Sequence, residues 1–119
     1  MDLKENADQI VSAIADEDIV ALVARQAGVL VGYGMVSLAR HYLGAIYIEP
    51  SMMGKKIGSQ ILAKLETVAR NHGLDYLELD ASLNSERFYL KNGYKRIGEG
   101  VHELQSGVSM ACIKMKKHM

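Results

Sequence analysis

Apolar positions change their spacing along the chain, and each change predicts a new element. Over residues 1–15 they recur at helical intervals, which predicts an amphipathic helix that covers a sheet face. Its apolar residues are Leu3, Ala7, Ile10, Val11 and Ile14. Two β-branched, apolar segments, residues 19–25 and 29–38, are joined by a short connection that ends in Gly28. A glycine-containing connection of that length predicts an antiparallel hairpin.

The middle of the chain predicts a strand, a long helix and another strand. Residues 43–49 form a third strand, which ends at Pro50 because proline cannot donate to a strand ladder. A helical apolar face follows over residues 57–69, and Gly73 suits the cap that ends it. Apolar and acidic residues then alternate over residues 77–81, which predicts a strand with one apolar side.

The last third of the chain predicts a short helix and two strands. Asn84 is suited to cap this helix, and Gly93 to the left-handed position that closes it. Strands are expected over residues 94–104 and 108–115. The order is then helix, three strands, helix, strand, helix and two strands. We expect a single domain over residues 1–119, built as a mixed α/β sandwich.

Composition and charge exclude several classes of protein. Hydrophobic residues make up 49% of the chain and charged residues 24%, which is typical of a globular domain and not of a disordered one. Fourteen basic residues balance fourteen acidic ones, so no long-range field would gather nucleic acid or an acidic membrane. We expect neither partner, and any anion site must be local.

Cysteine usage and the amino terminus bear on metals and location. The single Cys112 rules out an internal disulfide, and Cys and His do not occur at zinc-site spacing, so no metal is expected. Charged residues stand at the amino terminus where a signal peptide would need an apolar run. Apolar stretches are too short and interrupted to cross a membrane. A cytoplasmic location is therefore expected.

Residues 51–59 form a candidate anion-binding loop. They lie before the long helix, where unpaired backbone N–H groups and the helix dipole attract anions. Small residues would let a phosphate approach the backbone, and two lysines would add positive charge. The small residues are Gly54, Gly58 and Ser59, and the lysines are Lys55 and Lys56. A diphosphate is the ligand that best uses such a set.

Two other interpretations of this loop need weighing. In the first, Gly54 forms a turn, Gly58 allows close helix packing, and both lysines are merely solvated. In the second, the loop is a P-loop, a motif that needs four residues between its glycines and a lysine after them. Gly54 and Gly58 are separated by three residues and no lysine follows, so the sequence fits a P-loop less well than the other interpretations.

The order of residues across the loop carries a family resemblance. The window reads Met53-Gly54-Lys55-Lys56-Ile57-Gly58, preceded by Ile46-Tyr47-Ile48-Glu49-Pro50. It resembles the coenzyme A loop of the GNAT superfamily of N-acetyltransferases, whose pattern is Arg or Gln, two residues, Gly, one residue, then Gly or Ala. Met53 stands where the family has Arg or Gln, and Lys56 where it has the first Gly. The resemblance implies either altered coenzyme binding or a Lys56 that meets the coenzyme's phosphates as a charge.

Residues 79–94 carry a second part of the resemblance. They read LDASLNSERFYLKNGY, which is similar to the family's strand, Asn, Phe-Tyr and Gly-Phe segment. The implied fold is the α/β acyl-coenzyme A N-acyltransferase fold. It has a mixed, mostly antiparallel sheet, a splayed pair of parallel strands, and helices on both faces. The pantetheine arm of the coenzyme would then lie between residues 45–49 and 77–81.

The resemblance implies acetyl-coenzyme A as co-substrate and a set of residues that bind it. Those residues are Tyr47, Ile48, Met53, Gly54, Lys55, Lys56, Ile57, Gly58, Ser59, Asn84 and Tyr89. It also assigns Tyr89 as the acid for the departing thiolate. Phe88 would then take the core, because adjacent helical side chains diverge by about 100°. The alternative is a Tyr89 that packs its ring and hydrogen-bonds a carbonyl.

The attacking amine must lose a proton, so a carboxylate or histidine near the thioester is needed. Glu49, at the end of the third strand, is the first candidate, and its alternative is a solvated charge. Asp80, His41 and Tyr47 are further candidates. Cys112 has no evident base partner, so direct attack in a ternary complex is favoured over a covalent route.

Three classes of function follow. The first is an N-acetyltransferase that acts on a primary amine, either a small molecule or a peptide. The second is an acyl-coenzyme A binding or regulatory module without turnover, motivated by Met53, Lys56 and the single helix expected before Ile19. The third is a structural or interaction domain. The family has more elements before this point that shape the acceptor pocket, so an open pocket or a completing homodimer is expected.

Overall fold

The chain divides into two compact units. The computed structural model describes residues 9–14, 18–103 and 105–119. The first unit is Met1–Leu74 and the second is Asp75–Met119. A single domain over residues 1–119 stays a prediction.

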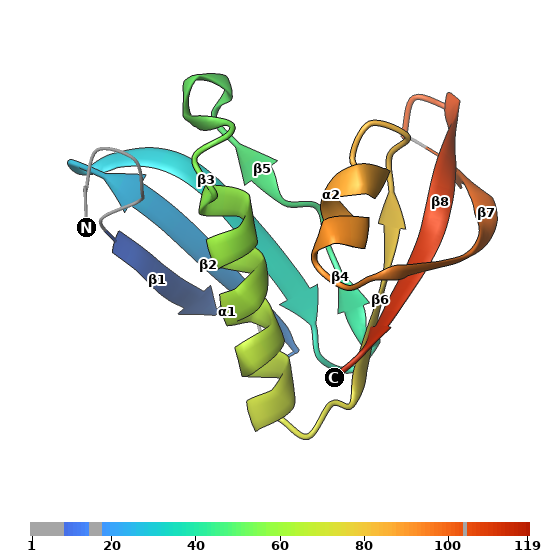
Figure 1. The fold of residues 1–119 in the computed structure, drawn as a ribbon, viewed down its shortest axis with the longest axis horizontal. Coiled ribbons are helices and arrows are strands. Elements are labelled where there is room, and N and C mark those ends of the chain that lie inside the picture. The colour runs from blue at the N-terminus through green and yellow to red at the C-terminus, as the bar shows by residue number, and fades with distance from the viewer. Residues whose placement is uncertain (1–8, 15–17, 104) are drawn as a thin grey trace. The chain divides into compact units, whose positions relative to one another are not determined.

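The first unit contains an antiparallel sheet. Its strands are β1 (Gln9–Ile14), β2 (Ile19–Gln26), β3 (Val29–Ser37), β4 (Tyr42–Leu43) and β5 (Tyr47–Ile48). β2 pairs with both β1 and β3, so the predicted hairpin is confirmed (Figure 1). Ala27 and Gly28 connect its strands with φ values of 52° and 79°, as a two-residue type I′ turn requires.

The predicted strand over residues 43–49 is interrupted. Both β4 and β5 pair with β3, but the step from Leu43 to Ile48 is five residues, whereas the matching step from Val36 to Gly32 is four. One extra residue is therefore inserted, which makes a β-bulge and breaks the regular ladder. The ladder is thus interrupted at residues 44–46 and resumes at β5, before the candidate loop.

The predicted amino-terminal helix is wrong where the structure describes it. Residues Gln9–Ile14 form β1, which pairs with β2 along its whole length. The helical pattern includes three β-branched residues that suit a strand equally well, and the pairing partner decides between the two structures. These residues are Ile10, Val11 and Ile14. Leu3 and Ala7, which belong to the same predicted helix, lie outside the described residues.

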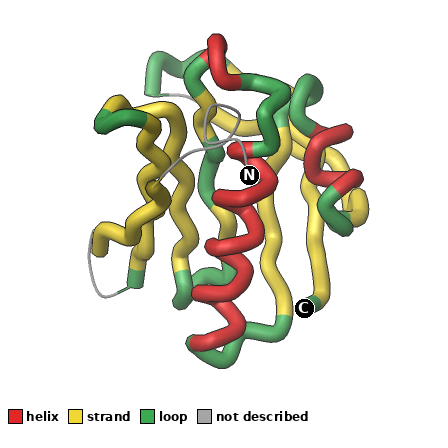
Figure 2. The backbone as a smooth tube through the Cα atoms, turned by 60° about the vertical axis from the view of Figure 1, so that its left-hand side comes forward, coloured by secondary structure: helices red, strands yellow, loops and turns green. Residues whose placement is uncertain are grey.

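Helix α1 (Ile57–Asn71) lies across β2 and β3 (Figure 1, Figure 2). Its buried apolar side chains confirm most of the predicted face: Ile57, Ile61, Leu62, Leu65 and Ala69. Glycine in β3 lets the helix come close, because a Cβ on Gly34 would lie 3.0 Å from Cγ2 of Ile61. The helix ends as predicted, with Gly73 at φ 85°. A 3-10 helix, η1 (Pro50–Met52), precedes it in the chain.

The described residues of the second unit form one short helix and an antiparallel sheet of three strands. The elements are β6 (Tyr76–Ala81), α2 (Glu86–Lys91), β7 (Lys95–Glu103) and β8 (Ser109–His118). β8 is central and pairs with β6 and β7, so all three predicted strands are confirmed. Leu77, Leu79 and Ala81 are buried on one side of β6, as their alternation predicts. Gly93 closes α2 at φ 93°.

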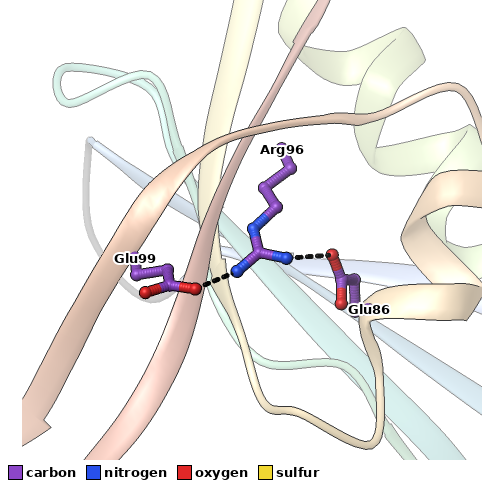
Figure 3. Close-up of polar contacts among 3 residues, drawn as sticks. All are labelled: Glu86, Arg96 and Glu99. Atoms are coloured by element: carbon purple, nitrogen blue, oxygen red, sulfur yellow. Dashed lines mark hydrogen bonds and ion pairs between the residues drawn. The ribbon is translucent and has the colours of Figure 1, made fainter.

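A charged cluster connects α2 to β7. Arg96 of β7 contacts Glu86 of α2 at 3.8 Å on one side and Glu99 of β7 on the other (Figure 3). The side chain of Glu86 is 25% exposed and that of Arg96 is 45% exposed. Both partners are therefore substantially solvated, and we expect the pair to contribute only a modest free energy.

Candidate functional site

The candidate loop begins at a carboxylate that caps η1. Oε2 of Glu49 accepts hydrogen bonds from the backbone N–H of Ser51 at 2.9 Å and from the Ser51 hydroxyl. Met53 is then extended, Gly54 turns at φ 81°, and Lys56 is left-handed at φ 65° immediately before α1. Gly54 does form a turn, which is compatible with either interpretation of the loop.

The backbone of the loop presents a row of open hydrogen-bond donors. The first intrahelical bond of α1 runs from the N–H of Gln60 to the carbonyl of Lys56 at 3.1 Å. The six amides before it have no acceptor in the part of the chain that the structure describes. They belong to Gly54, Lys55, Lys56, Ile57, Gly58 and Ser59. Consecutive open donors at a helix start fit a diphosphate.

The charge around these donors is positive. α1 has no acidic residue in its first turn, although acidic residues there normally stabilise a helix. Lys55 is half-buried and Lys56 is exposed, and neither has an ion-pair partner among the described residues. No carboxylate in the first turn therefore offsets the positive end of α1, which leaves this end available to an anion.

Lys56 stands where the family has glycine, and its backbone explains that preference. Its φ of 65° and ψ of 12° place it in the left-handed region, which costs a residue with a Cβ about 1–2 kcal/mol. Its carbonyl still accepts the first bond of α1. The loop thus keeps a glycine-like path with a lysine in it, at some expense of stability.

The two predicted coenzyme contacts on β5 lie on opposite faces of their sheet, as neighbours in a strand do. A Cβ on Gly32 would meet both Ile48 and Ile61 of α1, so Ile48 lies on the helix-covered face. Tyr47 is exposed and stacks on Tyr33 with ring centroids 5.3 Å apart. Their part in coenzyme binding stays a prediction.

The second unit holds Tyr89 and Phe88, and their burial is the reverse of the prediction. Tyr89 is 6% exposed and packs edge to face on Phe88 and Tyr94, with centroids 5.0 Å and 5.8 Å away. Phe88 is only half-buried, so the prediction that Phe88 fills the core is wrong. The turn after α2 gives the reason: the N–H of Tyr94 donates to the carbonyl of Tyr89 at 3.0 Å and brings the two rings together. The chemical role of Tyr89 stays a prediction.

The start of α2 lies one residue later than predicted. Ser85 is the N-cap, and Asn84 is exposed in the preceding turn, so the capping role assigned to Asn84 is wrong. The Ser85 hydroxyl lies 2.9 Å from the Ser82 hydroxyl and donates to the Ser82 carbonyl at 3.1 Å. Serine caps helices as readily as asparagine, so residue type alone does not separate these neighbours. Coenzyme binding by Asn84 stays a prediction.

The remaining candidate bases have structural surroundings of their own. Glu49 holds η1 through a hydrogen bond from Ser51. A carboxylate just before a proline-initiated turn indicates this capping role, which was not among the predictions for Glu49. Asp80 forms an ion pair with Lys114 at 3.4 Å, and His41 lies in the turn between β3 and β4 at φ 51°.

Among the described residues, no cluster of His, Cys, Asp and Glu could hold a metal ion, and no helix is long and apolar enough to cross a membrane.

Comparisons with known proteins point to one family. The family model described as an acetyltransferase (GNAT) domain matches residues 3–118. The chain is 31% identical over 107 residues to the aminoalkylphosphonate N-acetyltransferase of Salmonella typhimurium, and the alignment covers 81% of this chain and 70% of that one.

Two solved structures extend the likeness to the fold. A GCN5-related N-acetyltransferase from Rhodopseudomonas palustris (aminotransferase, class II) is 27% identical with a TM-score of 0.80, over 85% of this chain and 62% of that one. The PaiA N-acetyltransferase of Thermoplasma acidophilum, solved in complex with coenzyme A, is 24% identical with a TM-score of 0.68, over 86% and 62%. This chain thus spans less than two thirds of either of these two structures.

The fold is that of the acyl-coenzyme A N-acyltransferases, which confirms the predicted fold class. The chain belongs to the GNAT family of acyl-coenzyme A-dependent N-acetyltransferases, because that family model covers nearly all of it. Coenzyme binding by the residues of this loop stays a prediction, which membership of the family favours over solvated lysines without a ligand.

Proposed function

We propose that this protein transfers an acetyl group from acetyl-coenzyme A to a primary amine. The observation that carries the proposal is the row of six open amides from Gly54 to Ser59, which includes two lysines and has no acidic residue in the first turn of α1 beside it. The oxygens of a diphosphate can accept hydrogen bonds from several such amides at once. Coenzyme A carries a diphosphate, and PaiA, which shares the fold, was solved with coenzyme A.

The reaction joins the amine to the acetyl carbon and releases a thiol. The amine nitrogen attacks the thioester carbonyl, the C–N bond forms, and the C–S bond breaks. One amine proton leaves to a base, and the departing thiolate takes up a proton from an acid. Acid and base are regenerated by exchange with water, so the products are an N-acetyl amine and free coenzyme A.

We assign the acid to Tyr89 and the base to Glu49. The phenol of Tyr89 is weakly acidic and therefore suits a thiolate leaving group. The Glu49 carboxylate has a second oxygen besides Oε2, the atom that Ser51 uses, and that oxygen is the one we assign to the amine proton. Glu49 would thereby both hold the loop and accept the proton.

The acceptor class follows from the relatives. The Salmonella enzyme is by name an aminoalkylphosphonate N-acetyltransferase, so small amines that carry an anionic group are the first acceptors to test. Peptide amines are the second acceptor class to test.

The test has a binding arm and a turnover arm. Calorimetric titration with acetyl-coenzyme A should show one site, and a panel of aminoalkylphosphonates, polyamines and peptides should contain an amine that provokes stoichiometric thiol release. Binding without thiol release from any amine would replace the enzyme by a coenzyme-binding module. No binding at all would overturn both.

A further inference from the structure

Tyr33 of β3 and Tyr47 of β5 form an exposed aromatic pair on the first unit. They lie directly opposite each other in the ladder between these strands. Their rings stack with centroids 5.3 Å apart and planes inclined by 27°. Stacking covers one side of each ring, yet 39% of Tyr33 and 43% of Tyr47 remain exposed. A cross-strand aromatic pair stabilises a sheet, but that role does not require its outer surface to stay open.

The sheet face that carries this pair is the face opposite α1. Gly32 and Gly34 flank Tyr33 in β3, and a Cβ on either glycine would come within 3.2 Å of Ile61 in α1. Successive side chains of a strand point to opposite faces, so Tyr33 points away from the helix. Met35 shares the face of Tyr33 and is 38% exposed. The open surface around the pair is therefore aromatic and apolar.

A carboxylate follows the pair along the same strand. Glu49 lies two residues after Tyr47, and its N–H donates to the carbonyl of Val31 at 2.8 Å, so the pairing of β5 with β3 continues to this residue. Residues two apart in a strand share a face and lie about 7 Å apart. Glu49 is the base assigned above, and a protonated amine is attracted to its carboxylate. An amine held at Glu49 would have its carbon skeleton beside Tyr47.

The chemistry of this surface favours an aromatic group on the acceptor. A third ring can stack on the outer side of a tyrosine pair, and this contact adds to the ordinary gain from burying apolar surface. Met35 suits the same group, because its thioether sulfur contacts aromatic rings favourably. A small alkyl group would cover little of either tyrosine ring and would gain no stacking.

We propose that Tyr33 and Tyr47 bind an aromatic group of the acceptor and thereby determine which amines the enzyme prefers. The proposal rests on the function proposed above. It narrows the acceptor class to amines in which a short carbon chain joins the amino group to an aromatic ring, with or without an anionic group. Tyr47 can still contact the coenzyme through its backbone, because the backbone groups of a strand residue point along the sheet and its side chain points out of it.

The test compares matched acceptors by kcat/KM at saturating acetyl-coenzyme A. One pair is phenethylamine and ethylamine, and the other is the phosphonate analogues of phenylalanine and alanine. Within each pair the two compounds differ by the aromatic ring. Wild type should prefer the aromatic compound of each pair by about tenfold.

Tyr33→Leu tests the ring itself, because leucine is apolar but cannot stack. The aromatic-to-alkyl ratio of kcat/KM should fall about fivefold, mainly through a higher KM for the aromatic acceptor. The KM for acetyl-coenzyme A should not change, since Tyr33 is not among the predicted coenzyme contacts. Tyr33→Phe keeps the ring and should keep the ratio. Tyr76→Leu is the matched control, because Tyr76 lies opposite His118 in the sheet of the second unit, and it should also keep the ratio.

Two results would overturn the inference and leave the proposed function intact. The first is a wild-type ratio near one in both pairs of acceptors, a measurement that does not depend on the folding of any variant. The second is an equal loss of kcat/KM for aromatic and alkyl acceptors in Tyr33→Leu, because the tyrosine pair would then serve the sheet alone. A wild-type protein that acetylates no amine would instead reject the proposed function, and this inference with it.

Discussion

The two described α-helices begin in opposite ways. α2 starts at Ser85, whose hydroxyl bonds to Ser82, and its first turn carries Glu86, which pairs with Arg96 (Figure 3). α1 starts at a left-handed Lys56 with no side-chain cap and no acidic residue in the first turn. Every helix leaves its first amides open, so the difference lies in what surrounds them.

This contrast is the one we expect between a helix start that serves the fold alone and the diphosphate site proposed above. An acidic first turn stabilises a helix and repels an anion from its amides. Neither helix has a side-chain hydrogen bond that caps its first amides, but α2 has an acidic first turn, whereas α1 has none and adds two lysines. The start of α1 therefore keeps its amides open and its charge positive, as the diphosphate site proposed above requires.

The largest expected effect is a loss of turnover on substitution of Tyr89, which lies in the interior of α2 and not at either helix start. Tyr89→Phe should lower kcat by a factor on the order of 10²–10³, with a smaller change in acetyl-coenzyme A affinity, because it removes only the acid. Steady-state thiol release and calorimetry together measure the two effects. Tyr94→Phe removes a hydroxyl from the adjacent buried ring and should keep its kcat. Equal losses of kcat in both variants would assign Tyr89 to packing alone.

The second prediction converts the start of α1 into one like α2. Gly58→Asp adds a first-turn carboxylate and should weaken acetyl-coenzyme A about a hundredfold through repulsion of its phosphates. The midpoint of thermal unfolding should stay the same or rise, because the acid favours the helix. Arg87→Asp is the matched control, since it places a carboxylate at the same helical position of α2. A similar loss of affinity in the control would show that the effect is not specific to α1.

The third prediction concerns Asp18, a residue that we expect to affect stability at low pH but not coenzyme affinity. Asp18 accepts hydrogen bonds from the Ser37 hydroxyl at 2.7 Å and from the N–H of Ala39. The Ser37 bond first, then the Ala39 bond and the charge of Arg40, hold the pKa of Asp18 below its usual value. A depressed folded pKa stabilises the protein above the unfolded pKa, and that stability is lost as pH falls through the folded pKa.

Asp18→Asn should therefore destabilise the protein at neutral pH and lose part of the pH dependence of unfolding below about pH 4. Urea unfolding from pH 7 to pH 3 measures it. Acetyl-coenzyme A affinity at neutral pH should not change, because Asp18 lies outside the loop of open amides. Parallel stability curves for variant and wild type would contradict the role assigned to Asp18.

The smallest effect is expected at the acidic start of α2. Glu86→Gln removes both a first-turn acid and a solvated ion pair with Arg96, which together should lower the free energy of unfolding by about 0.5 kcal/mol at low salt. The difference should shrink in 1 M salt because the charges are screened. Denaturant titration at both salt concentrations measures it. An increase of the difference at high salt would show that the contact is not electrostatic.

Local patterns were sufficient for much of this protein. The apolar face of α1, the hairpin of β2 and β3, and the alternation in β6 depend on nearby residues and appear in the structure as predicted. The candidate loop was also predicted, because its glycines and lysines precede a helix start that the apolar period locates. Local signals were ambiguous at Asn84 and Ser85, which suit a cap equally well.

The sequence by itself thus determined where a diphosphate could meet a helix start, since that depends on residues close together in the chain. Tertiary structure decided what depends on distant partners: β1 is a strand because β2 lies beside it, and Tyr89 is buried because Tyr94 folds back onto it. It also decided that Lys56 is left-handed, because the loop must run from the bulged strand into α1 along a path that suits glycine. The spacing of apolar residues is a property of one segment, whereas strand pairing and backbone strain arise only when segments contact one another.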